Sequence, residues 1–219
     1  MRVKICGLRS RGDLAAAATA GAAYGGLVFY PPSPRHVSLA DARWIADDRP
    51  EGLILVALTV DATDAEFGEI VEAIPVDLLQ LHGAETPERA AEVRERFGRP
   101  VMKAVGVAED GDLDGLPEYA DAVDMLLIDA RPPPGAPVPG GNGVAFDWRL
   151  IQGQRWPKPW MLAGGLTPEN VAEAVRLTGA DQVDVSSGVE FARGLKDPAR
   201  ISAFVTAANG AATARKAAG

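Results

Sequence analysis

Short β-rich runs alternate with helical patterns from one end of the chain to the other. The runs are four to eight residues long and mostly apolar, as expected for buried strands. They predict eight strands: Val3–Cys6, Gly26–Tyr30, Leu53–Val60, Leu78–His82, Val101–Val107, Met125–Ala130, Trp160–Gly164 and Gln182–Ser186. This alternation is typical of repeated strand–helix units that build a parallel sheet.

Residues that cap helix N-termini precede several of the intervening stretches. Four of them can accept hydrogen bonds from the free amides of a first helical turn: Ser38, Thr86, Thr167 and Asp197. Three are followed by a proline, which suits a position that needs no N–H donor: Pro87, Pro168 and Pro198. The fifth helix is expected to be weak, because residues 116–120 offer scarcely one turn.

Eight strands is the number that closes a (β/α)8 barrel, and 219 residues is an ordinary length for one such domain. An open, doubly wound sheet shows the same alternation of strands and helices. That fold carries Gly-x-Gly-x-x-Gly after its first strand, where this chain has Cys6-Gly7-Leu8-Arg9-Ser10. We therefore predict an α/β fold, a single (β/α)8 TIM barrel with parallel strands over residues 1–219.

Two segments lie outside the repeating pattern. Residues 131–141 contain five prolines and no regular periodicity, so they form either a surface insertion or a loop that covers an active site. Residues 207–219 are rich in alanine and have little apolar periodicity, and we expect them to fray.

Composition and charge restrict the classes of function. Apolar residues make up 47% and charged residues 24%, as in an ordinary globular chain. A net charge of -8 without a basic run disfavours a nucleic-acid partner. No stretch approaches the roughly 18 apolar residues of a membrane span, and the N-terminal segment lacks the features of a secretory signal. We expect a cytoplasmic protein with no membrane partner, monomeric rather than dimeric.

The numbers of cysteine and histidine residues argue against a disulfide bond and against a structural metal site. The single cysteine excludes an internal disulfide, and the two separated histidines lack the spacing of zinc ligands. We therefore expect no metal site.

Polar residues at the carboxyl ends of the predicted strands are the candidates for chemistry, because barrel active sites form there. They are Cys6, Arg35, His82, Asp129, Gly164, Gly165, Asp184, Ser186 and Ser187. Residues two apart on a strand share a face, so Lys4 points inward with Cys6, and Asp129 with Leu127. Two ionisable groups, Cys6 and Asp129, are thus predicted to face the barrel mouth.

Each of these residues also has an ordinary structural interpretation. A lone cysteine in an apolar strand can be a small buried hydrophobe, and an aspartate after a strand can cap the next turn. His82 can be a hydrogen-bonding loop residue, and Arg35 a surface charge or the partner of a carboxylate. The combination of all four at strand ends favours a site.

Two consecutive loops carry a phosphate-binding pattern, Gly164-Gly165-Leu166-Thr167-Pro168 and Ser186-Ser187-Gly188-Val189. Barrels often bind phosphate at the loops after strands seven and eight, where glycines expose backbone N–H groups and a helix N-terminus favours an anion. Either loop alone could be only a tight turn. Together they favour a small phosphorylated substrate, with five candidate phosphate-binding residues: Gly164, Gly165, Ser186, Ser187 and Gly188.

The chain resembles the phosphoribosylanthranilate isomerase family of tryptophan biosynthesis in motifs that span nearly its whole length. They are Lys4-Ile5-Cys6-Gly7, Phe29 to Val37, Leu79-Gln80-Leu81-His82-Gly83, Gly140-Gly141-Asn142-Gly143 through Phe146-Asp147-Trp148, Leu162 to Leu166 with Pro168-Glu169-Asn170-Val171, and Asp184 to Glu190. The resemblance implies a (β/α)8 barrel, no cofactor, and conversion of N-(5-phosphoribosyl)anthranilate to 1-(2-carboxyphenylamino)-1-deoxyribulose 5-phosphate.

The same resemblance implies Cys6 as general base, Asp129 as general acid and Arg35 near the anthranilate carboxylate, and we add His82 and Asp184 as substrate-binding candidates. For these roles Asp129 should be partly desolvated and Cys6 helped toward thiolate. Lys4 could give that help, or could pair with a carboxylate deeper in the barrel.

Two departures from the family pattern stand out. Ala130 follows Asp129 where a small hydroxyl residue is usual, which puts the support of Asp129 in doubt. Asn142 stands where the family has threonine, which puts closure of the long loop in doubt.

Two other functions stay open at this point. Other phosphosugar-barrel isomerases and epimerases carry carboxylates or metal-binding histidines where this chain has Cys6. A non-catalytic barrel that binds a phosphorylated metabolite has no reason to retain both an acid and a base at its mouth.

Overall fold

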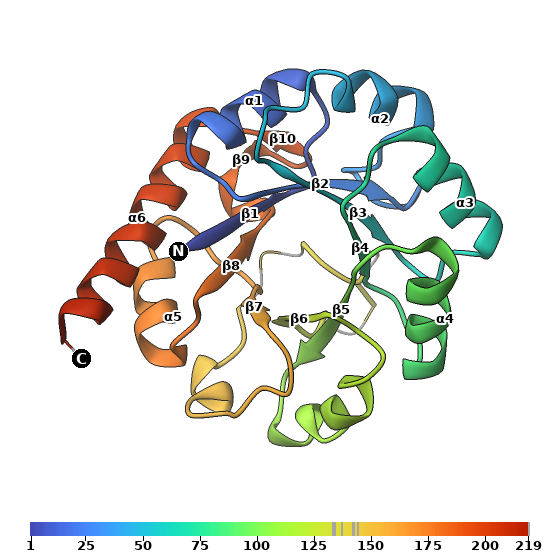
Figure 1. Cartoon of the computed structure of the whole chain (residues 1–219). Helices are drawn as coiled ribbons and strands as arrows, with labels where there is room; N and C mark the ends of the chain where they lie inside the picture. The colour runs from blue at the N-terminus through green and yellow to red at the C-terminus, as the bar shows by residue number, and fades with distance from the viewer. Residues whose placement is uncertain (133–134, 137, 142, 144, 219) are drawn as a thin grey trace.

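Eight parallel strands close a barrel in chain order, with β8 paired to β1 (Figure 1). The structure, a computed structural model, describes residues 1–132, 135–136, 138–141, 143 and 145–218. The strands are β1 (Arg2–Cys6), β2 (Tyr24–Phe29), β3 (Ile54–Thr59), β4 (Leu78–Leu81), β5 (Val101–Val107), β6 (Met125–Ala130), β7 (Trp160–Leu162) and β8 (Gln182–Val185). The predicted (β/α)8 barrel is confirmed, and every predicted strand is present within two residues of its expected bounds.

Helices surround this barrel on its outer side (Figure 1). They are α1 (Arg11–Thr19), α2 (Leu39–Ala46), α3 (Asp64–Ala73), α4 (Pro87–Phe97), α5 (Val171–Thr178) and α6 (Pro198–Ala218). Two short 3-10 helices, η1 (Asp110–Leu113) and η2 (Leu116–Tyr119), follow β5, and η3 (Trp148–Ile151) precedes β7. The prediction that the fifth helix is weak is therefore confirmed.

Three of the four predicted helix starts are confirmed. The side chains of Ser38, Thr86 and Asp197 accept hydrogen bonds from the first turns of α2, α4 and α6. Thr167 Oγ1 does accept from the Glu169 amide at 3.2 Å, but the helix start predicted there is wrong, because α5 begins at Val171 with Asn170 as its N-cap residue. The Asn170 side chain turns back and accepts from the Thr167 amide at 2.7 Å, which holds the preceding segment as a separate turn.

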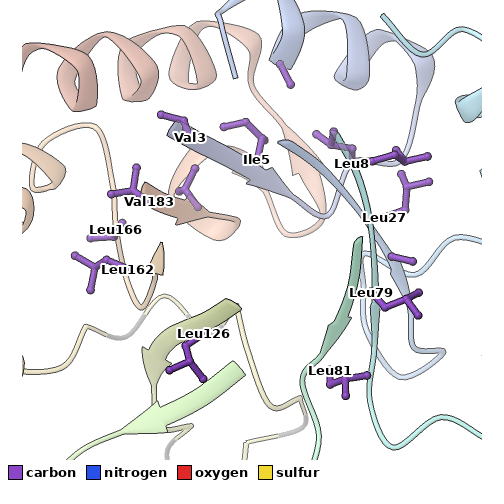
Figure 2. Packing of buried hydrophobic residues seen from close by; sticks show 14 of the residues in the cluster. Val3, Ile5, Leu8, Leu27, Leu79, Leu81, Leu126, Leu162, Leu166 and Val183 are labelled. Carbon is purple, nitrogen blue, oxygen red and sulfur yellow. The ribbon is translucent and has the colours of Figure 1, made fainter. Parts of the chain in front are cut away.

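The apolar core has two layers, one on each side of the barrel wall. The outer layer packs strands against helices, as Figure 2 shows for Val3 and Ile5, which lie between β1 and helix α6. The inner layer fills the barrel and includes Leu127, whereas Ile128 returns to the outer layer. This alternation confirms the predicted parity of β6. At the carboxyl end, Cys6, Val28 and Leu58 form the last apolar level beneath the mouth.

Residues 207–218 lie in a helix, and the expectation that this segment frays stays a prediction. Helix α6 continues to Ala218 and packs against α1 and α5. Alanine has the highest helix propensity, and Ala208 and Ala212 are buried, which explains how a stretch with weak apolar periodicity forms a helix. Among the described residues, no helix has both the length and the apolar character needed to cross a membrane.

A two-stranded antiparallel hairpin, which we did not predict, follows β8. It consists of β9 (Glu190–Ala192) and β10 (Leu195–Lys196), preceded by the 3-10 helix η4 (Ser187–Val189). Gly194 has a φ of 79° in the turn, a conformation that favours glycine. A Cβ atom at Gly194 would lie 2.6 Å from the Pro34 carbonyl oxygen, so the hairpin packs directly on the β2–α2 loop.

The capping box of α3 provides a test of local stability. Thr63 Oγ1 accepts from the Glu66 amide at 3.3 Å, and Glu66 Oε2 accepts from the Thr63 amide at 2.7 Å. We expect Thr63→Ala to lower the free energy of unfolding by about 1 kcal/mol, measured by urea denaturation. Thr63→Ser keeps the hydroxyl and serves as the control. Equal stability of the alanine variant and the unchanged chain would contradict the prediction.

Candidate active site

One pocket opens at the carboxyl-terminal mouth of the barrel and gathers nine of the ten residues that the sequence predicted for the site. They are Cys6, Arg35, His82, Asp129, Gly164, Gly165, Asp184, Ser186 and Ser187. Gly188 is outside the lining. The loop between β6 and η3 contributes Pro139, Gly140 and Gly141 to the same pocket, so this segment lies over the mouth and is not a remote surface insertion.

Cys6 ends β1 and lies beside a buried ion pair. Lys4 Nζ donates to Asp184 Oδ1 at 2.9 Å, and register places Lys4 directly opposite Asp184. A Cβ atom at Gly26 would lie 3.2 Å from Cys6 Sγ and 3.3 Å from Lys4 Cε, so this glycine leaves room for both side chains. The carboxylate partner of Lys4 is therefore at the mouth and not deeper in the barrel.

Burial and charge act on Cys6 in opposite directions. Burial raises the pKa of the Cys6 thiol, Asp184 raises it further, and the cations Lys4 and Lys196 lower it. The net pKa lies above the ordinary thiol value. Burial alone lowers the pKa of Lys4, but Asp184 and Cys6 together raise it, so Lys4 stays a cation. Lys4 thus lowers the pKa of Cys6, as expected, but burial raises that pKa by more.

Asp129 ends β6 and is held by two neighbours. Its Oδ1 accepts from the Ala130 amide at 2.8 Å, and its Oδ2 lies 3.3 Å from His82 Nε2. The other ring nitrogen of His82 lies 2.9 Å from Gln80 Nε2, which fixes the ring plane. A Cβ atom at Gly140 would lie 2.6 Å from His82 Nε2, so only a glycine can cover this pair. Main chain and histidine thus provide the support that a hydroxyl after Asp129 was expected to give.

Arg35 is buried, so the interpretation as a surface charge is wrong, whereas the alternative, that it pairs with a carboxylate, is confirmed. Its Nε donates to Glu190 Oε1 at 2.7 Å, and its Nη2 donates to Glu190 Oε2 at 3.1 Å and to the Gly141 carbonyl at 3.2 Å. Gly7, with a φ of 77°, lies against its aliphatic stem, where a Cβ atom would be 2.5 Å from Arg35 Cδ. The absence of a side chain at Gly7, in the turn after β1, therefore leaves the space that the Arg35 side chain occupies.

Sequence reasoning assigned no role to Glu190 or Lys196. Lys196 Nζ donates to Glu190 Oε1 at 2.8 Å and to the Ser186 carbonyl at 2.9 Å. The side chain of Lys196 is fully buried, although lysine is among the residues least often buried. A sequence signal for this pair does exist: Gly194 can form a turn between two short runs, one with Glu190 and the other with Lys196, so a hairpin would place the two charges side by side.

The loops after β7 and β8 expose backbone at the mouth and pack on each other. Gly164 and Gly165 have φ values of 83° and 61°. A Cβ atom at Gly188 would overlap the Leu166 carbonyl oxygen, so glycine is required where the two loops meet. Ser186 Oγ donates to the Cys6 carbonyl at 3.1 Å, which ties the loop after β8 to the end of β1.

The site lacks the donor set of a metal centre. Within the described part of the chain, no group of three or more His, Cys, Asp or Glu side chains is arranged to hold a metal ion. Asn142, one of the two departures from the family pattern, lies outside the described residues.

The raised pKa of Cys6 gives a test with iodoacetamide. The thiolate is the reacting form, and because the pKa in the folded chain is raised, more alkaline solution is needed to populate it. We expect the labelling rate of the native chain to keep rising above about pH 8.5, where the same chain in denaturant begins to level off. Cys6 is the single cysteine, so mass spectrometry assigns the label without ambiguity. Coincident native and denatured pH profiles would contradict the raised pKa.

Comparison with known proteins identifies the family. Residues 3–207 match the family described as N-(5'-phosphoribosyl)anthranilate (PRA) isomerase. The N-(5'-phosphoribosyl)anthranilate isomerase of Cereibacter sphaeroides is 65% identical over 208 residues, which cover 95% of this chain and 98% of the relative.

Solved structures agree in fold. Phosphoribosylanthranilate isomerase from Thermotoga maritima is 35% identical, with a TM-score of 0.86 and coverage of 96% of this chain and 99% of that one. A second phosphoribosylanthranilate isomerase structure, in complex with reduced 1-(o-carboxyphenylamino)-1-deoxyribulose 5-phosphate, is 34% identical, with a TM-score of 0.83 and the same coverage. Together with the barrel, its mouth and the match along nearly the whole sequence, these similarities establish that the chain belongs to the phosphoribosylanthranilate isomerase family.

Proposed function

We propose that this chain catalyses the Amadori rearrangement of N-(5-phosphoribosyl)anthranilate to 1-(2-carboxyphenylamino)-1-deoxyribulose 5-phosphate in tryptophan biosynthesis. The observation that carries the proposal is one pocket lined by a thiol, Cys6, a carboxyl group, Asp129, and the glycine-rich loops after β7 and β8. The reaction needs one acid, one base and an anchor for phosphate, and this pocket has a candidate for each.

Asp129 acts as the general acid. In its protonated form it gives a proton to the ribose ring oxygen while the bond between that oxygen and C1′ breaks, and the ring opens to a Schiff base. The Ala130 amide and His82 hold the carboxyl group from two sides, which fixes the direction of proton transfer. His82 also lines the pocket and contacts the substrate next to Asp129.

Cys6 acts as the general base. Its thiolate removes the C2′ proton, the C–H electron pair forms the enolamine, and the enolamine tautomerises to the ketone. Burial reduces the thiolate population, yet a thiolate formed there is a stronger base than one with an ordinary pKa. Lys4 limits the cost of ionisation by placing its positive charge beside the sulfur, and Asp184 holds Lys4 in place.

The two ends of the substrate are bound by different elements. The phosphate is held by Gly164, Gly165, Ser186, Ser187 and Gly188, whose backbone amides lie on the loops after β7 and β8. Arg35 binds the anthranilate carboxylate, because guanidinium and carboxylate groups match in shape and charge. Asp184 uses Oδ1 for Lys4, and its second oxygen accepts a hydrogen bond from the substrate. The chain is expected to act as one domain, as a cytoplasmic monomer and without a cofactor, and these four points stay predictions.

The proposed activity is tested with purified protein and freshly generated N-(5-phosphoribosyl)anthranilate. We expect the substrate fluorescence to fall as the aldose form is consumed, at a rate proportional to protein concentration. Controls without protein and with heat-denatured protein measure spontaneous decay of the substrate. Fluorescence that decays only at the control rate, with the fold intact by circular dichroism, would reject the proposal.

Separate loss of the acid and the base provides the second test. Asp129→Asn keeps the shape but has no proton of suitable acidity, and Cys6→Ala removes the base while leaving a small apolar group in the strand. General acid–base steps contribute typically ~10²- to 10⁴-fold, so we expect each kcat to fall by about that range. Binding of the product should change far less, because the phosphate loops are untouched.

Glu173→Gln is the matched control for both variants, since Glu173 is exposed on α5 and faces Arg176. Near-wild-type turnover of Cys6→Ala would make Cys6 a buried hydrophobe and move the search for the base to Asp184.

A further inference from the structure

We infer that Glu190 is a positioning residue for this reaction: it holds the Arg35 guanidinium in the orientation that receives the carboxylate of the substrate's aromatic ring. The inference rests on the proposed function. Glu190 lies in the β9–β10 hairpin, 155 residues along the chain from Arg35.

The contact between the two side chains is bidentate and almost fully buried. Glu190 Oε1 accepts from Arg35 Nε at 2.7 Å, and Oε2 accepts from Nη2 at 3.1 Å. Only 5% of each side chain is exposed, so water competes little for these bonds. The Gly141 carbonyl takes a further bond from Nη2 at 3.2 Å. The Nε and Nη2 edge of the guanidinium thus donates its hydrogen bonds to groups of the protein itself.

The opposite edge of the guanidinium faces the loop that covers the mouth. A Cβ atom at Gly141 would lie 2.5 Å from Arg35 Nη1, and both residues line the pocket. Glu190 holds Nε and Nη2, and Nη1 donates no hydrogen bond to a described residue, so Nη1 is the part of the guanidinium that can meet a ligand carboxylate. An arginine side chain has several rotatable bonds, and fixing it before the substrate arrives reduces the ordering cost of binding.

Glu190 is itself held in place by two further donors. Lys196 Nζ lies 2.8 Å from Oε1, and the Gly194 amide donates to Oε2 at 3.0 Å. Burial alone raises the pKa of Glu190, but Arg35, Lys196 and the Gly194 amide outweigh it and lower the pKa below its usual value. The carboxylate therefore stays ionised at neutral pH and remains paired with Arg35.

The arrangement allows the positioning role to be separated from a general role in stability. Lys196 also donates to the Ser186 carbonyl at 2.9 Å, a bond that does not pass through Glu190. When Glu190 loses its charge, Arg35 is released while Lys196 still supports the loop after β8. Loss of positioning thus weakens the carboxylate end of the site and spares the phosphate end, whereas general destabilisation affects both ends.

The test is Glu190→Gln, which keeps the side-chain size, with exposed Glu173→Gln as the matched control. Steady-state kinetics give kcat and KM, and calorimetry measures binding of anthranilate and of inorganic phosphate separately. We expect KM and the anthranilate Kd to rise by at least about tenfold, the size of one lost charge-assisted hydrogen bond. The kcat and the phosphate Kd should stay within about threefold, and Glu173→Gln should match the unchanged chain.

Two further measurements keep the inference open to rejection. The double variant Arg35→Gln with Glu190→Gln should bind anthranilate no more weakly than Arg35→Gln alone, because Glu190 acts through Arg35. Where thermal unfolding shows that Glu190→Gln is not folded, Glu190→Asp keeps the charge but shortens the reach, and the same split between the two ligands is expected. Unchanged anthranilate binding in a folded variant, or equal weakening of both ligands, overturns the inference. An inactive unchanged chain rejects the proposed function instead.

Discussion

Cationic side chains are buried in the barrel, and each requires a carboxylate beside it. Lys4 pairs with Asp184, Lys103 with Glu85, and both Arg35 and Lys196 with Glu190. An isolated buried charge is very costly, so these pairs dictate which strands and loops meet. Lys4 with Asp184 ties β1 to β8, and Glu190 ties the hairpin after β8 to the loop after β2.

The same kind of ion pair supports structure at one point of the barrel and chemistry at another. Glu85 accepts from Lys103 Nζ at 2.9 Å and also from the amides of Asp61 and Gly83, which joins the ends of β3, β4 and β5. Neither Glu85 nor Lys103 lines the pocket of the proposed site. Asp184 does line it, and Lys4 acts on the charge of Cys6. Position relative to the pocket, and not the type of pair, separates the two roles.

The parts of the site that follow from strand geometry could be predicted from the sequence. Strand ends face one mouth and alternate residues face inward, so Cys6 and Asp129 were found from position alone. The partner of Arg35 could not be found this way, because Glu190 is distant in the chain and lies in a hairpin too short for a periodic signal. Helix α6 extends through an alanine-rich stretch without an apolar stripe, because alanine has the highest helix propensity.

The acid and the base differ in their surroundings more than in their exposure, and this difference allows one pocket to hold both. The charges of two lysines, Lys4 and Lys196, lower the pKa of Cys6 against the effect of burial. In the part of the chain that the structure describes, the polar contacts of Asp129 are instead a backbone amide and a histidine ring. The Lys4–Asp184 pair ties β1 to β8, and within it Lys4 lowers the pKa of Cys6 while Asp184 and burial raise it, so one contact contributes both to closure of the barrel and to the state of the base.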